Sequence, residues 1–290
     1  MQHKIKIIHH TIYYRMKKIL AFSILLLFCS NGIFAQTTPS ANEMKNFRFG
    51  GTILPSLFWY KPDDLKKFAS NGVVPKFGVL INGEYSFSGN FALGFGIGLA
   101  SSGGKMTFTD TAHYYFSDDA IIMLKDTVPG KFDHYKLNNR TYNASYFIVP
   151  LSLKMRTNEI GYMRYFFQPC LNIAFRKKVR ANDDLTTLPK NGPLTGAGGG
   201  QSANQTNLDI TKDMNLIRLS ATLSAGGEYY ISGSTAIVFS IGYDYGLSNV
   251  VKGTSDYLLK TPFKSSGKDM KPIEQKFSQH GVILTVGVLF

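Results

Sequence analysis

The sequence predicts an all-β fold, an eight-stranded antiparallel transmembrane β-barrel with short periplasmic turns and long extracellular loops. Three observations support this prediction. Only 18% of the 290 residues are charged, below the roughly 25% of soluble domains, while 13% are aromatic and 28 are glycine. Apolar and polar residues alternate in eight successive segments. The connections between these segments alternate between short and long.

An export signal is expected at the N-terminus, over residues 1–35. An apolar run of ten residues, 19–28, follows Lys17 and Lys18 and is too short for a transmembrane helix. A basic start, a short apolar run and a small residue such as Ala35 are typical of a cleaved secretory signal peptide. We therefore expect export followed by cleavage after Ala35.

The domain boundaries follow from this signal. The signal peptide is predicted to begin at Met16, so residues 1–15 are an upstream extension. Residues 36–45 are then a short periplasmic segment, and residues 46–290 form the barrel. A lipoprotein anchor at Cys29 is the alternative, but Phe28 stands where such signals need a small residue.

The formal net charge of +13 raises the question of a nucleic-acid partner. Residues 1–35 hold five Lys and Arg and no acidic residue, so the mature chain has a net charge of +8. An exported protein does not meet DNA or RNA, and we expect no nucleic-acid partner. Only Cys170 remains after cleavage, which excludes an internal disulfide.

The eight predicted strands each place apolar residues at every second position, with small or polar residues between them. Each is long enough to cross a bilayer when tilted, which takes roughly 9–11 residues. In the first, Phe49, Ile53 and Leu57 lie on one face, and Arg48 and Thr52 on the other. The predicted strands run over 48–59, 77–87, 91–100, 147–156, 164–176, 217–231, 237–245 and 281–290.

The connections distinguish a membrane barrel from a soluble β-sandwich, which is the alternative. Short turns are predicted at 88–90, around 158–159 and at 232–234. Strict alternation of short turns with long loops is the layout of an outer-membrane barrel, and a sandwich does not require it. We therefore expect the bacterial outer membrane as the location. The four long connections are 61–75, 103–140, 180–213 and 249–276.

The last strand ends on an aromatic residue. Terminal Phe after strict alternation resembles the signal by which outer-membrane barrels are recognised for insertion, so the barrel-assembly machinery is an expected partner. An ordinary edge strand that ends on Phe is the alternative. The residues of this predicted assembly signal are Phe290, Val288, Val286 and Leu284.

Seven charged residues fall on the inward face of the predicted strands. An eight-stranded barrel is just wide enough for side chains to fill it, and buried charges must pair. Because both signs are present, we predict a salt-bridged network that plugs the lumen. A narrow channel is the alternative. The predicted lumen charges are Arg48, Glu84, Lys154, Arg164, Arg218, Glu228 and Asp244.

Catalytic chemistry would need a nucleophile, base or carboxylate set near one rim. The mature chain has three histidines, His113, His134 and His280, and Ser278 is near the last of them. Asp256 or Asp269 could complete such a set. No Gly-x-Ser-x-Gly or His-Glu-x-x-His motif occurs in the sequence. We expect solvated loop histidines and predict no enzyme, catalytic residue, cofactor or metal site.

The long loops contain the remaining signals. In the second, the apolar stretch 120–124 either extends the barrel strands above the membrane or binds a partner protein. The glycine-rich stretch 196–200 of the third loop predicts flexibility. Asp118–Asp119 and Asp183–Asp184 could bind calcium weakly but lack the spacing of a dedicated site. Two Asp-Thr-x triplets, at 110–112 and 126–128, resemble O-glycosylation sites of Bacteroidetes.

The fourth loop is rich in lysine. Outside a bacterium such lysines meet anionic lipopolysaccharide, so outer-membrane lipid and lipopolysaccharide are expected partners. A protein partner at the extracellular loops is a further possibility that the sequence leaves open. The lysines are Lys252, Lys260, Lys264, Lys268, Lys271 and Lys276.

Several segments resemble the PorT-type outer-membrane β-barrel family of Bacteroidetes. They are PheArgPheGlyGly at 47–51, residues 76–88 and 147–156, TyrAspTyrGlyLeuSerAsn at 243–249 and the terminal strand. The family's Pro-Leu-x-Leu-Lys motif is matched by Pro150 to Lys154, and its Tyr-x-Tyr-Gly-Leu strand end by Tyr243 to Leu247. The founding member is tied to type IX secretion.

From these observations together we predict a non-enzymatic integral outer-membrane barrel that acts as a structural scaffold or as a binding or secretion-associated component through its extracellular loops. A rim-located lipid-modifying enzyme and a narrow channel are the alternatives.

Overall fold

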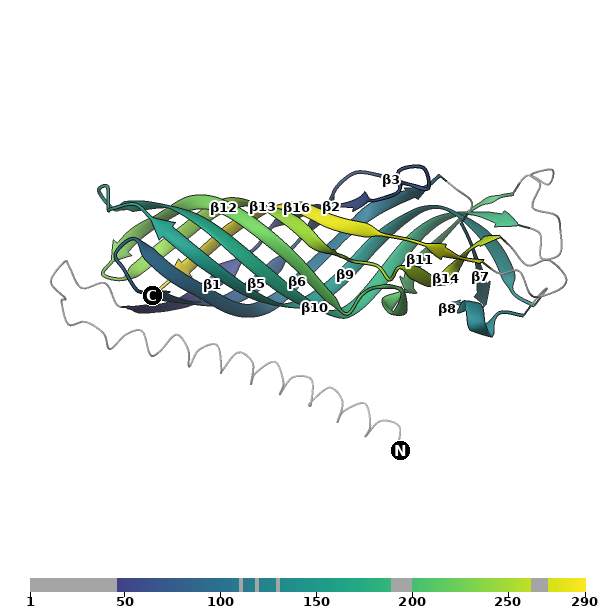
Figure 1. The fold of residues 1–290 in the computed structure, drawn as a ribbon, viewed down its shortest axis with the longest axis horizontal. Coiled ribbons are helices and arrows are strands. Elements are labelled where there is room, and N and C mark those ends of the chain that lie inside the picture. The colour runs from purple at the N-terminus through teal and green to yellow at the C-terminus, as the bar shows by residue number, and fades with distance from the viewer. Residues whose placement is uncertain (1–45, 110–111, 118–119, 129–130, 189–199, 262–270) are drawn as a thin grey trace, which may run out of the picture. The chain divides into compact units, whose positions relative to one another are not determined.

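A computed structural model describes residues 46–109, 112–117, 120–128, 131–188, 200–261 and 271–290. The expected signal peptide, its cleavage site and the segment 36–45 lie outside these residues. Eight strands form a closed antiparallel ring in the order β1, β5, β6, β9, β10, β12, β13, β16 and back to β1 (Figure 1). The prediction of an all-β, eight-stranded antiparallel barrel is confirmed.

The described chain contains sixteen strands and two short 3₁₀ turns. No helix among the described residues is long and apolar enough to cross a membrane. The elements are β1 Phe47–Ile53, β2 Ser56–Pro62, β3 Phe68–Ser70, β4 Val74–Lys76, β5 Gly78–Ser86, β6 Phe91–Phe108, β7 His113–Ser117, β8 Ala120–Ile121, η1 Leu124–Asp126, β9 Asp133–Arg156, β10 Met163–Leu188, β11 Ser202–Asp209, η2 Thr211–Asp213, β12 Ile217–Ser232, β13 Thr235–Asn249, β14 Thr254–Thr261, β15 Lys271–Glu274 and β16 Phe277–Leu289.

The alternation of the sequence corresponds to the two faces of the barrel wall. Phe49 in β1 is 56% exposed and Ile81 in β5 is 67% exposed, whereas Arg48 between Phe47 and Phe49 is 1% exposed. Water would disfavour such apolar side chains on the outer surface, but a lipid bilayer accommodates them. The outward face of the ring is therefore the lipid-facing surface.

The first predicted strand is divided into β1 and β2 at Leu54 and Pro55. Proline has no backbone N–H to donate to a neighbouring strand. The wall remains closed because the Leu54 N–H donates to the Gly78 carbonyl at 2.8 Å and the Leu284 N–H donates to the Pro55 carbonyl at 2.8 Å. Beyond the break, β2 pairs with β16 on one side and β4 on the other.

Short turns lie at one end of the barrel, as the sequence predicts. β12 and β13 are joined by a tight turn between Ser232 and Thr235, where Gly233 has φ +55°. Gly161, between β9 and β10, has φ +65°. Glycine adopts these left-handed conformations without steric cost, and turns of this kind match the twist of the paired strands.

Beyond the opposite end, the wall continues as an ordered β-structure. β9 and β10 are 24 and 26 residues long and stay paired from Arg156 and Phe166 to His134 and Leu188. The predicted strands 147–156 and 164–176 include only the parts of β9 and β10 that lie nearest the short turns. We call residues 60–76, 101–145, 177–216 and 248–279, where described, the outer extension (Figure 1).

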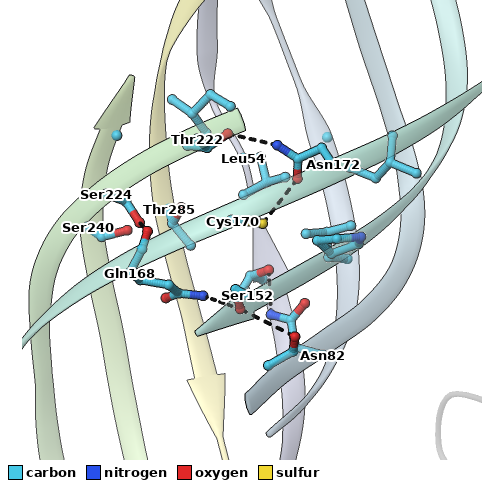
Figure 2. A pocket seen from close by; sticks show the side chains of 18 of the residues that line it. Leu54, Asn82, Ser152, Gln168, Cys170, Asn172, Thr222, Ser224, Ser240 and Thr285 are labelled. Atoms are coloured by element: carbon cyan, nitrogen blue, oxygen red, sulfur yellow. Dashed lines mark hydrogen bonds between the residues drawn. The ribbon is translucent and has the colours of Figure 1, made fainter. Parts of the chain in front are cut away.

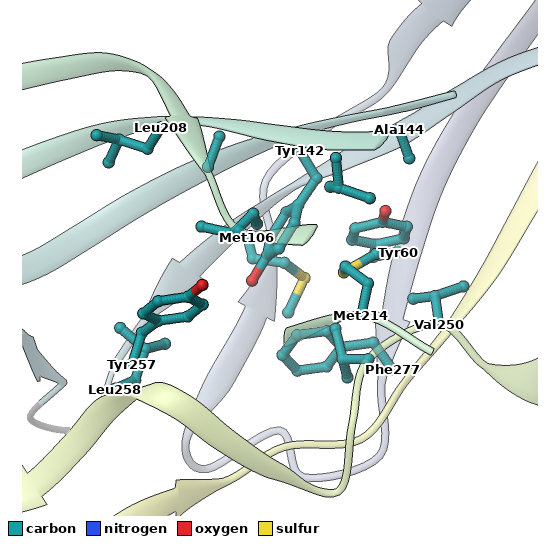
Figure 3. Close-up of a cluster of buried hydrophobic side chains, with 14 of the residues drawn as sticks. Tyr60, Met106, Tyr142, Ala144, Leu208, Met214, Val250, Tyr257, Leu258 and Phe277 are labelled. Carbon is teal, nitrogen blue, oxygen red and sulfur yellow. The ribbon is translucent and has the colours of Figure 1, made fainter. Parts of the chain in front are cut away.

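The outer extension has its own hydrophobic core (Figure 3). In β9, Tyr142 and Ala144 point inward and are 2% exposed. The core also receives residues from β2, β6, β10, β14 and β16 and from the connections between them. Its labelled members in Figure 3 are Tyr60, Met106, Tyr142, Ala144, Leu208, Met214, Val250, Tyr257, Leu258 and Phe277.

Candidate functional site

A buried ionic cluster lies in the lumen near the short turns. It consists of Arg48 from β1, Glu84 from β5, Lys154 and Arg156 from β9, and Glu228 from β12, and we call it the lumen ion cluster. Arg48 donates to Glu84 at 2.6 Å and to Glu228 at 2.8 Å. Lys154 bridges the same two carboxylates at 2.6 and 2.8 Å.

Arg156, which the predicted network did not include, completes this cluster. It contacts Glu84 and donates from Nε to Glu228 at 3.3 Å. The Tyr230 hydroxyl donates to Glu228 at 2.9 Å and accepts from Arg48 at 3.1 Å. Three cations therefore share two carboxylates, and the shared carboxylates hold four strands together across the lumen.

The other predicted lumen charges lie apart from this cluster. Arg218 donates to Asp244 at 3.2 Å, and Thr222 donates to the same carboxylate at 2.8 Å. Arg218 also lies over the Tyr146 ring, 5.5 Å from its centroid. Arg164 donates to Glu159 of the short turn at 3.3 Å. The seven predicted residues thus form three separate ionic groups.

A cavity of about 140 Å³, lined by both polar and apolar side chains, lies in the lumen between the first two groups (Figure 2). Lys154 and Glu84 line it together with Arg218 and Asp244. The Gln168 side-chain amide donates a hydrogen bond to the Ser152 hydroxyl at 2.7 Å. The Ser224 hydroxyl donates to the Gln168 backbone carbonyl at 3.1 Å. Hydroxyl and amide groups of this kind suit bound water. The labelled lining residues are Leu54, Asn82, Ser152, Gln168, Cys170, Asn172, Thr222, Ser224, Ser240 and Thr285.

Two carboxylates of the outer extension are buried and fully engaged. Asp183 accepts two hydrogen bonds from Arg140, at 2.7 and 2.6 Å, so it is an ion-pair partner and not a loop ligand for calcium. Asp213 accepts from the Ser255 hydroxyl at 2.5 Å and from Gln275 at 3.2 Å. Burial raises the pKa of Asp213 above its usual range.

All three histidines are buried, contrary to the expectation of solvated loop histidines, and two of them lie in the outer extension. His113 is 2% exposed and His134 is 5% exposed. Their ring centroids are 5.1 Å apart, and His134 stacks on Tyr115 at 4.8 Å. Burial lowers the pKa of each histidine to about 4, because the charged imidazolium loses its hydration. The sequence places His113 and His134 in a predicted loop, whereas the structure packs this segment around a hydrophobic core, and this packing buries them.

The third histidine, His280, forms a chain of contacts on the outward face. Its Nε2 lies 3.1 Å from the Ser278 hydroxyl, and its Nδ1 lies 3.2 Å from the Tyr243 hydroxyl. The two carboxylates considered from the sequence do not supply this second contact. Asp256 pairs with Lys252 at 2.7 Å, and Asp269 lies outside the described residues.

Other expectations also fall outside the described part of the chain. They include Asp118–Asp119, most of the glycine-rich stretch 196–200, the first triplet at 110–111, and Lys264 and Lys268 of the fourth loop. Among the residues that the structure describes, no group of three or more His, Cys, Asp and Glu side chains could hold a metal ion.

A closed ring with an apolar outward face and a polar, charged lumen defines an integral outer-membrane β-barrel protein. The chain belongs to the family of the outer membrane protein beta-barrel domain, whose model matches residues 34–252. It is located in the bacterial outer membrane. No curated protein sequence matches the chain.

Several solved barrels are similar in structure. Neisserial surface protein A is 11% identical, with 84% of this chain and 96% of that chain covered and a TM-score of 0.38. Ail, the attachment invasion locus protein of Yersinia pestis, is also 11% identical, with 85% and 100% covered and a TM-score of 0.34. The outer membrane protease OmpT of Escherichia coli is 10% identical, with 87% and 99% covered and a TM-score of 0.32.

These structures correct one expectation. The sequence predicted that the protein is not an enzyme, because familiar catalytic motifs were lacking. That prediction is contradicted, since the solved barrels similar to this one include the outer membrane protease OmpT. A catalytic site is recognised by the mutual geometry of its groups, so the lack of a local sequence motif is a poor criterion for its absence.

Proposed function

We propose that this protein is a cell-surface binding scaffold whose outer extension holds an anionic component of the envelope, lipopolysaccharide in the first place. The observation that carries the proposal is the buried core of the outer extension. Tyr60, Met106, Leu137 and Phe277 are each completely buried there. A loop end that served only to connect strands would not need a core of its own.

A packed core fixes the surface that surrounds it. Tyr60 stands edge-on to Tyr142 with ring centroids 5.2 Å apart, and Phe68 stands edge-on to Phe277 at 5.0 Å. Such a surface is ordered before a ligand arrives, so binding costs less conformational entropy than it would for free loops. This favours a binding role for the outer extension.

The charge of the surface favours an anionic ligand. Four exposed lysines, Lys61, Lys105, Lys177 and Lys178, follow the last lipid-facing residues of β2, β6 and β10, and we call them the lysine band. Phe175, 40% exposed, is the lipid-facing residue just before the pair in β10. Cations at this level meet the phosphates of lipid headgroups, where charge-assisted hydrogen bonds are strong.

The channel alternative is less well supported. The lumen ion cluster fills one end of the lumen, and the core of the outer extension fills the other. An ion would have to displace Arg48 or Glu228 from contacts under 3 Å to pass.

We also propose that the protein is of the PorT type found in Bacteroidetes. Support comes from the two motifs at Pro150–Lys154 and Tyr243–Leu247, which lie in β9 and β13. Lys154 bridges both carboxylates of the lumen ion cluster, and Gly246 faces the Gln279 backbone so closely that a Cβ would lie 2.3 Å from its carbonyl oxygen. These motifs therefore perform structural tasks, and a link to secretion rests on the resemblance alone.

Titration of the barrel in nanodiscs with purified lipopolysaccharide tests the binding role. Reversing charge with Lys177→Glu and Lys178→Glu should weaken binding about tenfold or more, because two favourable contacts become repulsive. Lys125→Glu, in η1, combined with Lys131→Glu is the matched control, since it reverses the same number of charges at exposed sites outside the lysine band. Equal affinity of the double variant and the control would refute the proposal.

A further inference from the structure

Ser278 and His280 lie two positions apart on β16, so both side chains are on the same face of the strand. That face is the outward one, because Leu284 and Val286 on it are 47% and 45% exposed. The Ser278 hydroxyl lies 3.1 Å from His280 Nε2, closer than its other acceptor, the Lys61 carbonyl, at 3.5 Å. A serine and a histidine thus face the lipid side within hydrogen-bond reach.

The depth of this pair places it at the outer membrane interface. From Phe290 at the short-turn end, the outward face of β16 is apolar up to Val282, and polar side chains begin at His280. Ten residues of a strand tilted by about 40° span about 25 Å, the height of the apolar band of such barrels. The pair therefore lies at the level where lipid headgroups join their acyl chains.

The aromatic neighbours of His280 fix the orientation of its ring. Tyr245 stands edge-on to it with centroids 4.8 Å apart, and Trp59 stacks on it at 6.5 Å. The side chain of His280 is 3% exposed, whereas Ser278 is only partly buried. The base is shielded from water while the hydroxyl is accessible from the membrane surface.

The Tyr243 hydroxyl lies 3.2 Å from Nδ1 and can accept a hydrogen bond from it. When Nδ1 carries the proton and donates it to the Tyr243 oxygen, the Nε2 lone pair is free to accept the Ser278 proton. This is the arrangement of a nucleophile, a base and an orienting third group that activates serine for acyl transfer. Tyr243 takes the orienting position that a carboxylate or amide has in many such sites.

We propose that Ser278 and His280 form a nucleophile–base pair that cleaves acyl esters of membrane lipids in the outer leaflet. This activity goes beyond the proposed binding role, with which it shares Lys61. Lys61 and Asn249, the cross-strand partners of Ser278, flank the nucleophile on either side. The exposed Lys61 supplies a cation at the site for the anionic headgroup of the substrate.

The reaction proceeds in two balanced steps. Ser278 Oγ attacks the ester carbonyl carbon while its proton passes to His280 Nε2. The bond between the carbonyl carbon and the alcohol oxygen breaks, and the proton on Nε2 goes to the departing alcohol. Water then attacks the acyl-serine, with His280 taking its proton and returning it to Ser278, which releases the free fatty acid.

Two measurements on the full-length barrel in detergent micelles test this activity. The first is covalent labelling by a fluorophosphonate, in which Ser278 Oγ bonds to phosphorus and fluoride leaves. The second is hydrolysis of a long-chain p-nitrophenyl ester. We expect the label on Ser278 by peptide mass spectrometry, and Ser278→Ala and His280→Gln should each lower hydrolysis by about 10²-fold or more.

The matched control is Ser88→Ala, which removes an exposed serine from a short turn at the opposite end of the barrel. Slower migration of boiled than of unboiled samples on SDS gels confirms that each variant is folded. Tyr243→Phe tests orientation: it should lower kcat about tenfold, leave KM unchanged and move the acidic limb of the pH–rate profile. Absence of labelling in the folded wild type, or full hydrolysis by Ser278→Ala, would overturn the proposal.

Discussion

Among single residues, Glu228 is one of the two carboxylates that balance the three cations of the lumen ion cluster. It accepts hydrogen bonds from Lys154, Arg48 and Arg156, and a fourth from Tyr230. Removing a partner from a buried ionic group leaves charge without compensation, which costs about 3–5 kcal/mol. The effect should depend on the sign of the charge removed, because this cluster has one more cation than it has carboxylates.

Glu228→Gln should therefore lower the free energy of unfolding by about 3–5 kcal/mol, and Arg156→Gln by clearly less. The first change leaves three cations with one carboxylate, and the second leaves two of each. Urea unfolding of the barrel in detergent, followed by tryptophan fluorescence and gel mobility, measures both. A larger loss for Arg156→Gln would contradict this account of the cluster.

The sequence predicts whether a strand residue faces the lumen or the lipid better than it predicts which residues that side chain contacts. Alternation places Arg48, Glu84 and Glu228 in the lumen, and the structure brings them into contact. Alternation also puts Arg156 on the inward face, two positions after Lys154, and this was the signal for the missing member of the cluster. The contact between Tyr243 and His280 depends on the register of β13 and β16, which pairs Tyr245 with His280 and which no local pattern encodes.

At the scale of elements, β9 reverses the sense of its alternation along its length. In the membrane, Leu151 points outward and Ser152 inward, whereas in the outer extension Tyr142 points inward and Asn143 lies on the outer face. The surroundings change from lipid to water, so the apolar side chains change face. Outward-facing apolar residues end at Phe147 in this part of the sequence. For this reason the sequence predicts a loop before Phe147 and not a strand. The strand itself continues to Asp133.

The buried pair His113 and His134 gives the outer extension a pH dependence. Burial lowers the pKa of each to about 4, below the ordinary value of about 6.5. The unfolded chain thus binds protons more readily, and the extension loses stability as pH falls from about 6.5 to about 4, with no further loss from these groups below that. At pH 4.5 we expect a loss of about 2–3 kcal/mol for each histidine.

Amide hydrogen exchange in β7 and β9, corrected for the intrinsic rate, measures this loss at pH 7 and pH 4.5. His134→Phe is the control, because it keeps an aromatic ring beside Tyr115 and cannot take up a proton. The pH dependence should shrink in this variant. Equal protection at both pH values in the wild type would show that the histidines are not coupled to folding.

For the whole molecule, the lumen has three zones from the short turns outward. The lumen ion cluster comes first, the cavity of about 140 Å³ second, and the apolar core of the outer extension third. The charged network and the apolar core present different barriers to an ion. The interior of an eight-stranded barrel is just wide enough for side chains to fill, and here they leave this cavity among the described residues.

The barrel should therefore show no ion conductance above background when reconstituted into a planar lipid bilayer at neutral pH. An ion that crosses must break contacts of 2.6 to 2.8 Å between Arg48 and its two carboxylates and then lose its hydration among Tyr60, Met106 and Phe277. Glu228→Gln should not open a path by itself, because the apolar core still closes the outer end. Discrete, long-lived conductance steps in the wild type, dependent on the inserted protein, would show that the lumen conducts.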